Sequence, residues 1–454
     1  MTPQVHMNAA SMHSAGRTIV VGLGRTGLSC ARYLHGHGIE FAVTDNRAMP
    51  PESAALQRLA PSTEVVFGKF DEALLDGAAE IVVSPGVSLR EPFLVKAAER
   101  GISIAGDIEL FARAVRAPVA AVTGTNGKST VTTLVAQMAA ASGKRVLAGG
   151  NLGRPALELL EDPTPELYVL ELSSFQLDTT RSLRPAAATV LNVTPDHLDR
   201  YDSLEAYAAS KARIFMNCEA AVLNLDDPAV RAMSEKGGRV LGFSLVRDPA
   251  ADYYVLEQGV EVALMYREQR LALLSELKIT GLHNAANALA ALAMSDALGL
   301  SRERAVQALR EFPGLPHRSQ WIADLAGVRY VEDSKGTNVG ATLAAVAGMP
   351  APLVLIAGGL GKGQDFSPLA AAFRGKVRHV VLLGQDARLI AAALRDVATV
   401  EFAHDMDEAV RRAAAVARPG DTVLLSPACA SMDMFRDYAH RGDVFAAAVR
   451  GLSA

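Results

Sequence analysis

The sequence has few cysteines, and they are scattered. Cys30, Cys218 and Cys429 lie far apart in the 454 residues, with no CxxC or Cys/His spacing between them. An odd number of distant cysteines argues against a disulfide framework and against structural zinc. A reducing compartment fits this pattern, so we expect a cytoplasmic protein.

Long apolar runs and blocks of one charge are also missing. No segment offers about 18 uninterrupted apolar residues, so we expect no membrane insertion. Residues 1–16 lack the basic start and apolar run of a secretory signal, and we interpret them as a loose N-terminal extension. The formal net charge is −4 without a Lys/Arg block, which does not indicate a nucleic-acid surface. With 50% hydrophobic residues the chain is typical of a well-packed globular protein.

The length and the alternation of patterns predict several α/β domains. About 100 to 200 residues per domain is usual, and we expect three, over residues 17–105, 106–313 and 314–454. Short apolar runs alternate with helical stretches throughout, which is typical of doubly wound sheets. Strands are expected at 17–24, 41–44, 81–84, 102–105, 118–122, 168–170, 189–192, 221–224, 329–332, 353–357, 379–383 and 422–425, and helices at 28–37, 130–141, 204–215, 284–298 and after Ser301.

The first glycine motif is Gly22-Leu-Gly24-Arg-Thr-Gly27, which follows an expected strand and opens an expected helix. Asp45 ends the next strand, which completes a dinucleotide fingerprint with its ribose-binding acid. Alone, the motif favours a nicotinamide-dependent oxidoreductase. A helix N-terminus binds any phosphate, including that of a UDP-sugar, and turn glycines without a ligand are a third interpretation.

The second glycine motif is Gly124-Thr-Asn-Gly127-Lys128-Ser129-Thr130, again between a strand and a helix. Backbone amides of such a loop can hold phosphates, while Lys128 neutralises β/γ charge and Ser129 reaches Mg²⁺. Position 122 is Val rather than the glycine of the general ATPase pattern. A nucleotide-binding enzyme, a non-catalytic nucleotide-binding regulator and a chance surface turn are the alternatives.

Single polar residues near these loops have both functional and ordinary interpretations. Glu171 and His197 follow expected strands, where α/β sheets bind ligands, but a helix cap and a solvated histidine are the ordinary interpretations. Lys211 lies on an expected amphipathic helix, where a solvated lysine is the usual case. Asn284 and Asn287 share a helix face or cap that helix. Arg318 and Lys362 stand in polar or glycine-rich stretches that suit anions.

Taken in order, the motifs resemble those of the Mur ligases of peptidoglycan synthesis, over residues 17–454. The resemblance implies a Rossmann-like N-terminal domain, a central P-loop ATPase-type domain with a mostly parallel sheet, and a Rossmann-like C-terminal domain. It rests on the phosphate loop and on Glu171-Leu-Ser-Ser174, Asp196-His-Leu-Asp199, Gly281-Leu-His-Asn284, Leu315-Pro-His-Arg318 and Asp333-Ser-Lys-Gly-Thr337-Asn.

Other segments are similar to one branch of this family, the ligase that adds D-glutamate to UDP-N-acetylmuramoyl-L-alanine. These are Gly22–Gly27, Asp45-Asn-Arg47, Ser84-Pro-Gly86 and Leu425-Ser-Pro-Ala-Cys-Ala-Ser431. The resemblance implies that ATP phosphorylates the substrate carboxylate and that the amine of D-glutamate attacks the acyl phosphate. Another Mur ligase or a folylpolyglutamate synthase is the alternative, and a monomer is expected.

The resemblance also implies a role for each matching residue. ATP would contact Gly124, Thr125, Asn126, Gly127, Lys128, Ser129, Thr130, Asn284, Asn287, Arg318 and Asp333. The UDP substrate would contact Arg25, Thr26, Asp45, Asn46, Arg47, Gly86, Asn151 and His197. D-Glutamate would contact Lys335, Thr337, Lys362, Ser431 and Tyr438. Mg²⁺ would be held by Ser129, Glu171, His197 and a carbamylated Lys211, and the catalytic residues would be Lys128, Glu171, His197 and Lys211.

Overall fold

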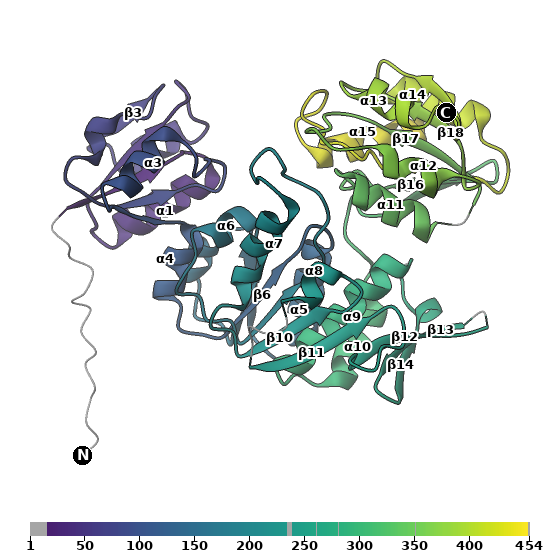
Figure 1. The fold of residues 1–454 in the computed structure, drawn as a ribbon, viewed down its shortest axis with the longest axis horizontal. Helices are drawn as coiled ribbons and strands as arrows, with labels where there is room; N and C mark the ends of the chain where they lie inside the picture. The colour runs from purple at the N-terminus through teal and green to yellow at the C-terminus, as the bar shows by residue number, and fades with distance from the viewer. Residues whose placement is uncertain (1–15, 234–237, 260, 280, 350, 453–454) are drawn as a thin grey trace. The chain divides into compact units, whose positions relative to one another are not determined.

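The computed structural model describes residues 16–233, 238–259, 261–279, 281–349 and 351–452 (Figure 1). The expected N-terminal extension therefore lies outside the described residues, apart from Gly16. Within the described ranges the strands form sheets of five, nine and six strands. The chain divides into two compact units, one of residues up to Thr123 with 144–188 and 210–219, and the other of 124–143, 189–209 and residues from Ala220 onward.

The first sheet is parallel throughout and has the order β3-β2-β1-β4-β5. Its central strand β1 aligns Val20 with Val43 of β2 and with Val82 of β4, and all three side chains are buried. Runs of this kind, apolar on both faces, are typical of parallel strands covered by helices. The strands are β1 (Arg17–Val21), β2 (Phe41–Asp45), β3 (Val65–Phe67), β4 (Ala78–Val83) and β5 (Ser103–Ala105), and the helical segments are α1 (Arg25–Gly36), α2 (Ser53–Leu59), η1 (Glu72–Leu75) and α3 (Pro92–Glu99).

The rest of the first unit contains three parallel strands in the order β6-β8-β7. Phe111 packs edge-to-face on Tyr168 of β8, with 5.3 Å between the ring centroids, and this contact fixes α4 against the sheet. The elements are α4 (Asp107–Ala114), β6 (Val119–Thr123), β7 (Val146–Gly150), η2 (Ala156–Glu161), β8 (Leu167–Glu171), α6 (Ser174–Asp178) and η3 (Arg213–Phe215); β9 (Ala187–Val190) and α7 (Leu204–Ala212) carry the chain from one unit to the other.

In the second unit, helices α5, α9 and α10 pack on one another, and the strands change direction along the sheet. Strands β10, β11 and β12 are parallel, whereas β12, β13 and β14 form an antiparallel meander. The elements are α5 (Lys128–Ala141), β10 (Ala220–Asn224), α8 (Pro228–Arg231), β11 (Arg239–Ser244), β12 (Tyr253–Gln258), β13 (Glu261–Tyr266), β14 (Gln269–Leu273), η5 (Leu274–Glu276), α9 (Leu282–Ala297) and α10 (Arg302–Glu311).

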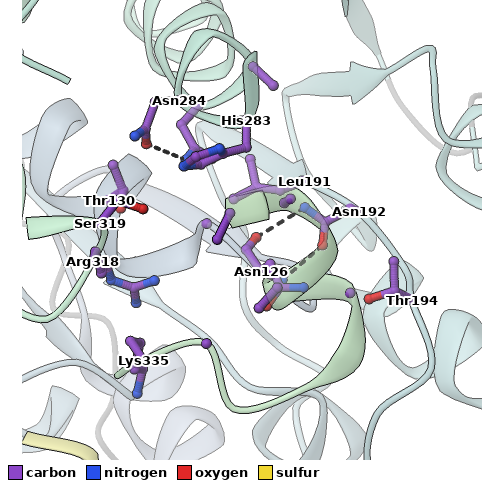
Figure 2. Close-up of a pocket in the computed structure, with 18 of the residues that line it drawn as sticks. Asn126, Thr130, Leu191, Asn192, Thr194, His283, Asn284, Arg318, Ser319 and Lys335 are labelled. Atoms are coloured by element: carbon purple, nitrogen blue, oxygen red, sulfur yellow. Dashed lines mark hydrogen bonds between the residues drawn. The ribbon is translucent and has the colours of Figure 1, made fainter. Parts of the chain in front are cut away.

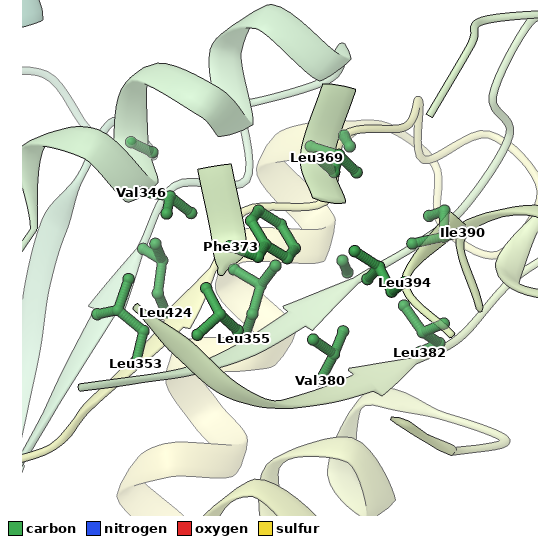
Figure 3. Packing of buried hydrophobic residues seen from close by; sticks show 14 of the residues in the cluster. Val346, Leu353, Leu355, Leu369, Phe373, Val380, Leu382, Ile390, Leu394 and Leu424 are labelled. Carbon is green, nitrogen blue, oxygen red and sulfur yellow. The ribbon is translucent and has the colours of Figure 1, made fainter. Parts of the chain in front are cut away.

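The third sheet has the order β15-β16-β20-β17-β18-β19, and only the edge strand β15 is antiparallel. Leu355 and Phe373 are fully buried between the sheet and its helices (Figure 3). The elements are β15 (Gln320–Leu325), β16 (Val328–Glu332), α11 (Val339–Gly348), β17 (Leu353–Ala357), α12 (Ser367–Phe373), β18 (Val377–Leu382), α13 (Ala387–Ala393), β19 (Thr399–Phe402), α14 (Met406–Val416), β20 (Thr422–Leu425) and α15 (Tyr438–Gly451).

The predicted fold class is confirmed, and so is each predicted strand to within a few residues. The prediction was incomplete in the second unit, because the meander β12–β14 was not foreseen. The edge strands β3, β7, β15 and β19 were also missed, and so was the interior strand β11. Every helix that the structure describes is too short or too polar to cross a membrane.

Candidate active site

The phosphate loop is shaped by two glycines and closed by one lysine. Gly124 has φ 153° and Gly127, the residue before α5, has φ 84°, values that a side chain strongly disfavours. A Cβ atom on Gly127 would lie 2.3 Å from Oδ1 of Asn287, so only glycine fits there. Lys128 Nζ donates to the carbonyl oxygens of Gly124 and Thr125, both at 2.9 Å. The loop therefore presents a fixed positive charge beside a helix N-terminus.

The segment after β9 supports this loop. Asn126 N donates to Oδ1 of Asn192 at 2.8 Å, and Nδ2 of Asn192 donates back to the Asn126 carbonyl at 3.1 Å. Thr194 N donates to Oγ1 of Thr125 at 3.0 Å. Asn192 was not among the predicted site residues, although its position as the last residue of the expected strand 189–192 was an available signal.

A cavity of ≈ 260 Å³ opens beside the loop (Figure 2). His283 also lines it and was not predicted; burial lowers its pKa, so the imidazole is neutral near pH 7. The predicted residues that the structure brings together here are Asn126, Gly127, Thr130, Asn284, Asn287, Arg318, Asp333 and Lys335.

Arg318 lies just before β15 and Asp333 directly after β16, and both residues line this cavity. Arg318 donates to Oγ of Ser129 at 2.8 Å, and its neighbours His317 and Ser319 both have positive φ. Asp333 accepts hydrogen bonds from Ser319 N and from the Ser426 hydroxyl. Burial raises the pKa of Asp333 to about 7, so its charge is held at some cost beside the guanidinium.

Asn284 and Asn287 do not cap their helix. The N-cap of α9 is Gly281, and no side-chain cap hydrogen bond forms at that position. Instead Nδ2 of Asn287 donates to Oδ1 of Asn284 at 3.3 Å, and both line the cavity. The capping interpretation is wrong.

A second cavity, of ≈ 670 Å³, lies at the carboxyl ends of the first sheet. Asp45 is buried at its edge and accepts from Leu23 N at 2.7 Å and from Arg47 Nε and a terminal guanidinium nitrogen at 2.8 and 2.6 Å. Burial raises the pKa of Asp45, but these hydrogen bonds outweigh it, and the pKa is lowered overall. The predicted residues found here are Arg25, Thr26, Asp45, Asn46, Arg47, Gly86 and Asn151.

Glu171 is the last residue of β8 and is 3% exposed. Its Oε1 accepts from Nδ2 of Asn151 at 2.6 Å, whereas Oε2 is buried without a hydrogen-bond partner. The N-cap of α6 is Ser173, so the helix-cap interpretation of Glu171 is wrong. A buried carboxylate oxygen without a partner is a feature that a bound cation would satisfy.

Lys211 is buried, whereas the side chain of His197 is partly exposed. Lys211 is 1% exposed, so the solvated-lysine interpretation is wrong. His197 has φ 56° and stands 3.7 Å from Asp196. Burial lowers the pKa of His197 and outweighs the negative charge of Asp196, which acts in the opposite direction. The neutral ring is therefore favoured. No cluster of three His, Cys, Asp or Glu side chains suited to a metal exists among the described residues.

Four of the predicted D-glutamate contacts lie on loops that follow the carboxyl ends of interior strands of the third sheet. Lys335 and Thr337 follow β16, Lys362 follows β17 and Ser431 follows β20, and these three strands are neighbours in the sheet. Tyr438 begins α15, and Nζ of Lys335 stands 3.7 Å from the centroid of its ring. Basic and hydroxyl groups thus follow the carboxyl ends of three neighbouring strands.

Comparison with known proteins supports one family along the whole chain. The family "Mur ligase MurD-like, N-terminal domain" matches residues 16–106, "Mur ligase middle domain" matches 122–295, and "Mur ligase, glutamate ligase domain" matches 317–429. A protein of Nitrosococcus oceani named UDP-N-acetylmuramoylalanine–D-glutamate ligase is 51% identical over 438 residues, which cover 96% of this chain and 97% of that one. A Coxiella burnetii protein of the same name is 46% identical and covers 97% and 100%.

Solved structures show the same fold at low identity. The UDP-N-acetylmuramate-alanine ligase MurC of Thermotoga maritima has a TM-score of 0.60 at 19% identity and covers 96% of this chain and 99% of its own. MurF of Acinetobacter baumannii has a TM-score of 0.61 at 18% identity and covers 79% and 87%. With the near full-length identity to curated relatives, these matches establish that the chain belongs to the Mur ligase family.

Proposed function

We propose that the protein joins D-glutamate to UDP-N-acetylmuramoyl-L-alanine and converts ATP to ADP and phosphate. The observation that carries this proposal is the 46–51% identity over nearly the full length to relatives named for that reaction. The two cavities support it, because one adjoins a phosphate loop and the other adjoins a glycine turn with an ion-paired acid. A cytoplasmic location is part of the proposal, since the reaction consumes ATP, and the protein is proposed to act as a monomer.

The triphosphate would bind at the loop from Gly124 to Thr130. Backbone amides at the start of α5 and the ammonium of Lys128 would meet the phosphate oxygens. Arg318, already 2.8 Å from the Ser129 hydroxyl, would add a second positive charge. Asn284 and Asn287, on the helix opposite, would contact the nucleoside portion. These groups would offset the repulsion between a triphosphate and the attacking carboxylate.

The UDP portion of the other substrate would occupy the cavity of the first sheet. The N-terminus of α1 offers free amides to the diphosphate. Thr26, Asn46 and Arg47 line that cavity and would contact the nucleotide, with Arg47 aligned by its paired hydrogen bonds to Asp45. Arg25 and Gly86 line the same cavity, and Asn151 would contact the substrate further along.

The proposed reaction has two steps. The carboxylate of the L-alanyl group attacks the γ-phosphorus of ATP, the bond to the β-phosphate oxygen breaks, and ADP leaves. The amine of D-glutamate then attacks the acyl phosphate, loses a proton, and expels inorganic phosphate to leave the amide. Lys128 and Arg318 would stabilise charge in the first step, and the neutral ring of His197 would be able to accept a proton or to coordinate a metal ion.

The residues present fit Mg²⁺ in one respect that the structure shows directly, the unpartnered buried Oε2 of Glu171. Ser129, Glu171, His197 and Lys211, the last as a carbamate, would hold the ion, which would supply charge stabilisation to the phosphoryl group. A carbamate replaces the positive charge of Lys211 by a negative one. That change suits a lysine that is 1% exposed and predicted to adjoin a cation.

D-Glutamate would bind at the carboxyl ends of the interior strands of the third sheet. Lys335 and Lys362 would pair with its two carboxylates, and Thr337 and Ser431 would donate hydroxyl hydrogen bonds. Tyr438 would cover this subsite from the start of α15, beside Lys335.

The proposal is tested by phosphate release from ATP, Mg²⁺ and UDP-N-acetylmuramoyl-L-alanine across a panel of amino acids. Release that depends on D-glutamate is expected. Preference for another amino acid would assign the chain to a different ligase of the family, and release without any amino acid would remove the ligase function. With ¹⁸O in the substrate carboxylate, one label should appear in the released phosphate, because that oxygen bonds to phosphorus in the first step.

A further inference from the structure

One buried acid lies outside all the roles assigned above. Asp107 is the first residue of α4 and is 1% exposed. Its Oδ2 accepts from Nε2 of Gln176 at 2.8 Å, while Oδ1 is buried without a hydrogen-bond partner. A buried carboxylate oxygen without a hydrogen-bond partner is unfavourable, because it has lost its contacts with water. Such a group calls for an explanation beyond helix packing.

Gln176 is the partner that gives Asp107 a role. It lines the cavity of the first sheet together with Asn151 and is 3% exposed. Its Oε1 accepts from Ser173 N at 3.1 Å, as part of the capping box of α6. One hydrogen of Nε2 is directed to Asp107. An amide nitrogen carries two hydrogens, so the second remains for the cavity.

The carboxylate fixes which end of the amide faces which neighbour. An ionised Asp107 accepts hydrogen bonds only, so the Gln176 amide must turn its nitrogen toward it and its oxygen toward Ser173. Burial raises the pKa of Asp107 to about 6, with the Gln176 hydrogen bond acting in the opposite direction, so the group is ionised near pH 7.5. Without this acid, the rotated amide would present a different hydrogen-bonding edge to the cavity.

The backbone keeps the two residues together. Gly106, which precedes Asp107, is packed so closely on α6 that a Cβ atom there would lie 2.2 Å from Oγ1 of Thr179. The Thr179 hydroxyl donates to the carbonyl oxygen of Gln176 at 3.1 Å. The start of α4 and the helix α6 therefore hold a fixed separation.

We propose that Asp107 is a positioning residue for the UDP substrate, acting through Gln176. It orients the Gln176 amide so that an N–H donor points into the cavity of the first sheet, toward acceptor oxygens of the sugar or diphosphate. The ligand class follows from the proposed function, on which this inference rests: a nucleoside diphosphate sugar, rich in acceptors and without positive charge. Asp107 itself does not touch the ligand.

The test is a double-mutant cycle read by calorimetric binding of UDP-N-acetylmuramoyl-L-alanine. Asp107→Ala and Gln176→Met should each weaken binding about tenfold, the effect of one hydrogen bond to a charged ligand, and the double variant should bind no more weakly than Gln176→Met alone. Asp107→Asn should recover all but about threefold, because its amide oxygen still accepts from Gln176. Binding of ATP should stay within about twofold in every variant, since the inference concerns the other cavity.

Glu109→Gln is the matched control, since Glu109 is the other buried acid of α4 and bonds to the backbone of Arg181 and Ser182 instead. It should leave binding of the UDP substrate unchanged. Effects of Asp107→Ala and Gln176→Met that multiply, or a lower melting temperature with unchanged affinity, would overturn the inference. If Asp107→Ala does not fold, the Asn variant decides, and unchanged binding there would overturn it. Failure of the proposed function is seen separately, as wild-type protein that binds no UDP substrate.

Discussion

The two glycine turns of this protein share a backbone plan and differ in the charge placed beside it. Gly22–Gly27 and Gly124–Gly127 each lead into a helix whose preceding residue is a glycine, Gly24 or Gly127. At the first turn an acid, Asp45, accepts from the loop backbone. At the second a base, Lys128, donates to it. A strand-to-helix turn suited to phosphate is thus common to both, and in the proposed function the neighbouring side chain distinguishes the ligands.

The comparison also corrects the oxidoreductase hypothesis. In a dinucleotide site the acid after the second strand binds ribose hydroxyls. Here both oxygens of Asp45 are occupied by Arg47 and Leu23. The ion pair presents a guanidinium edge at that position, which suits an anion. The hypothesis is wrong, and the family assignment agrees.

The largest expected effect lies at the second turn. Lys128→Ala should lower the rate of phosphate release about 10³-fold, because it removes the fixed charge beside the transferred phosphoryl group. The matched control is Lys144→Ala, an exposed lysine beyond the end of the same helix that pairs with Glu166. Near-normal release by Lys128→Ala would break the assignment of this turn to ATP.

A variant of Lys211 tests whether this buried side chain takes part in the proposed reaction at the phosphate loop. Lys211→Ala should lower turnover at least about 10²-fold, because it removes a proposed Mg²⁺ ligand, and the loss of even an outer partner of a ligand costs about 10- to 100-fold. Partial recovery with added acetate is expected, since a free carboxylate replaces the carbamate. A turnover rate that stays near that of the wild type would contradict a role for Lys211 in catalysis.

At the first glycine turn, a substitution should change the KM for the UDP substrate. Arg47→Ala should raise the KM for the UDP substrate about tenfold, because one charge-assisted contact is lost and Asp45 is left buried without its main partner. The KM for ATP should change less than about twofold, since the two sites are separate. Arg58→Ala, at an exposed position on α2, serves as the control. Equal effects on both KM values would break the division between the turns.

The smallest expected effect is on the pH dependence of stability, through two buried acids. The pKa of Asp45 is lowered in the folded protein, whereas that of Asp333 is raised. A raised folded-state pKa stabilises the protein below the unfolded value of about 4. That contribution is lost as pH rises through about 7 for Asp333. The melting temperature of wild type should therefore fall relative to Asp333→Asn between pH 5 and pH 8. Asp45, with its lowered pKa, should contribute stability that is lost only below about pH 4. A constant difference between wild type and Asp333→Asn would contradict the raised pKa.

The sequence predicted the parts of this molecule that follow from local patterns. Strand β17 was predicted with its observed bounds, since Leu353–Ala357 is a continuous apolar run with both faces buried. The meander β12–β14 was missed because its exposed positions break the apolar runs, as in Glu261 and Gln269. Edge strands such as β19 have one partner and little burial, so their sequences carry a weak signal.

Short sequence motifs predicted which segments form the sites. They did not predict which side chains are buried or contact one another. Periodicity alone favoured a solvated Lys211, because burial of that side chain depends on elements distant in sequence. Asn192 and Gln176 lie in none of the quoted motifs, and His283, although within Gly281–Asn284, was assigned no role; the cavities that they line depend on contacts distant in sequence. The pairing of Arg47 with Asp45 could have been foreseen, since the residues are two apart, but its geometry could not.

The central claim is that the first glycine turn binds the UDP substrate and the second binds ATP. It is tested most directly by calorimetric measurement of the affinity of two variants for each of these two ligands. Lys128→Ala should lose affinity for ATP and keep that for UDP-N-acetylmuramoyl-L-alanine, whereas Arg47→Ala should show the reverse. Loss of both affinities in either variant, with melting temperatures equal to wild type, would contradict two separate sites assigned by the charge beside each turn.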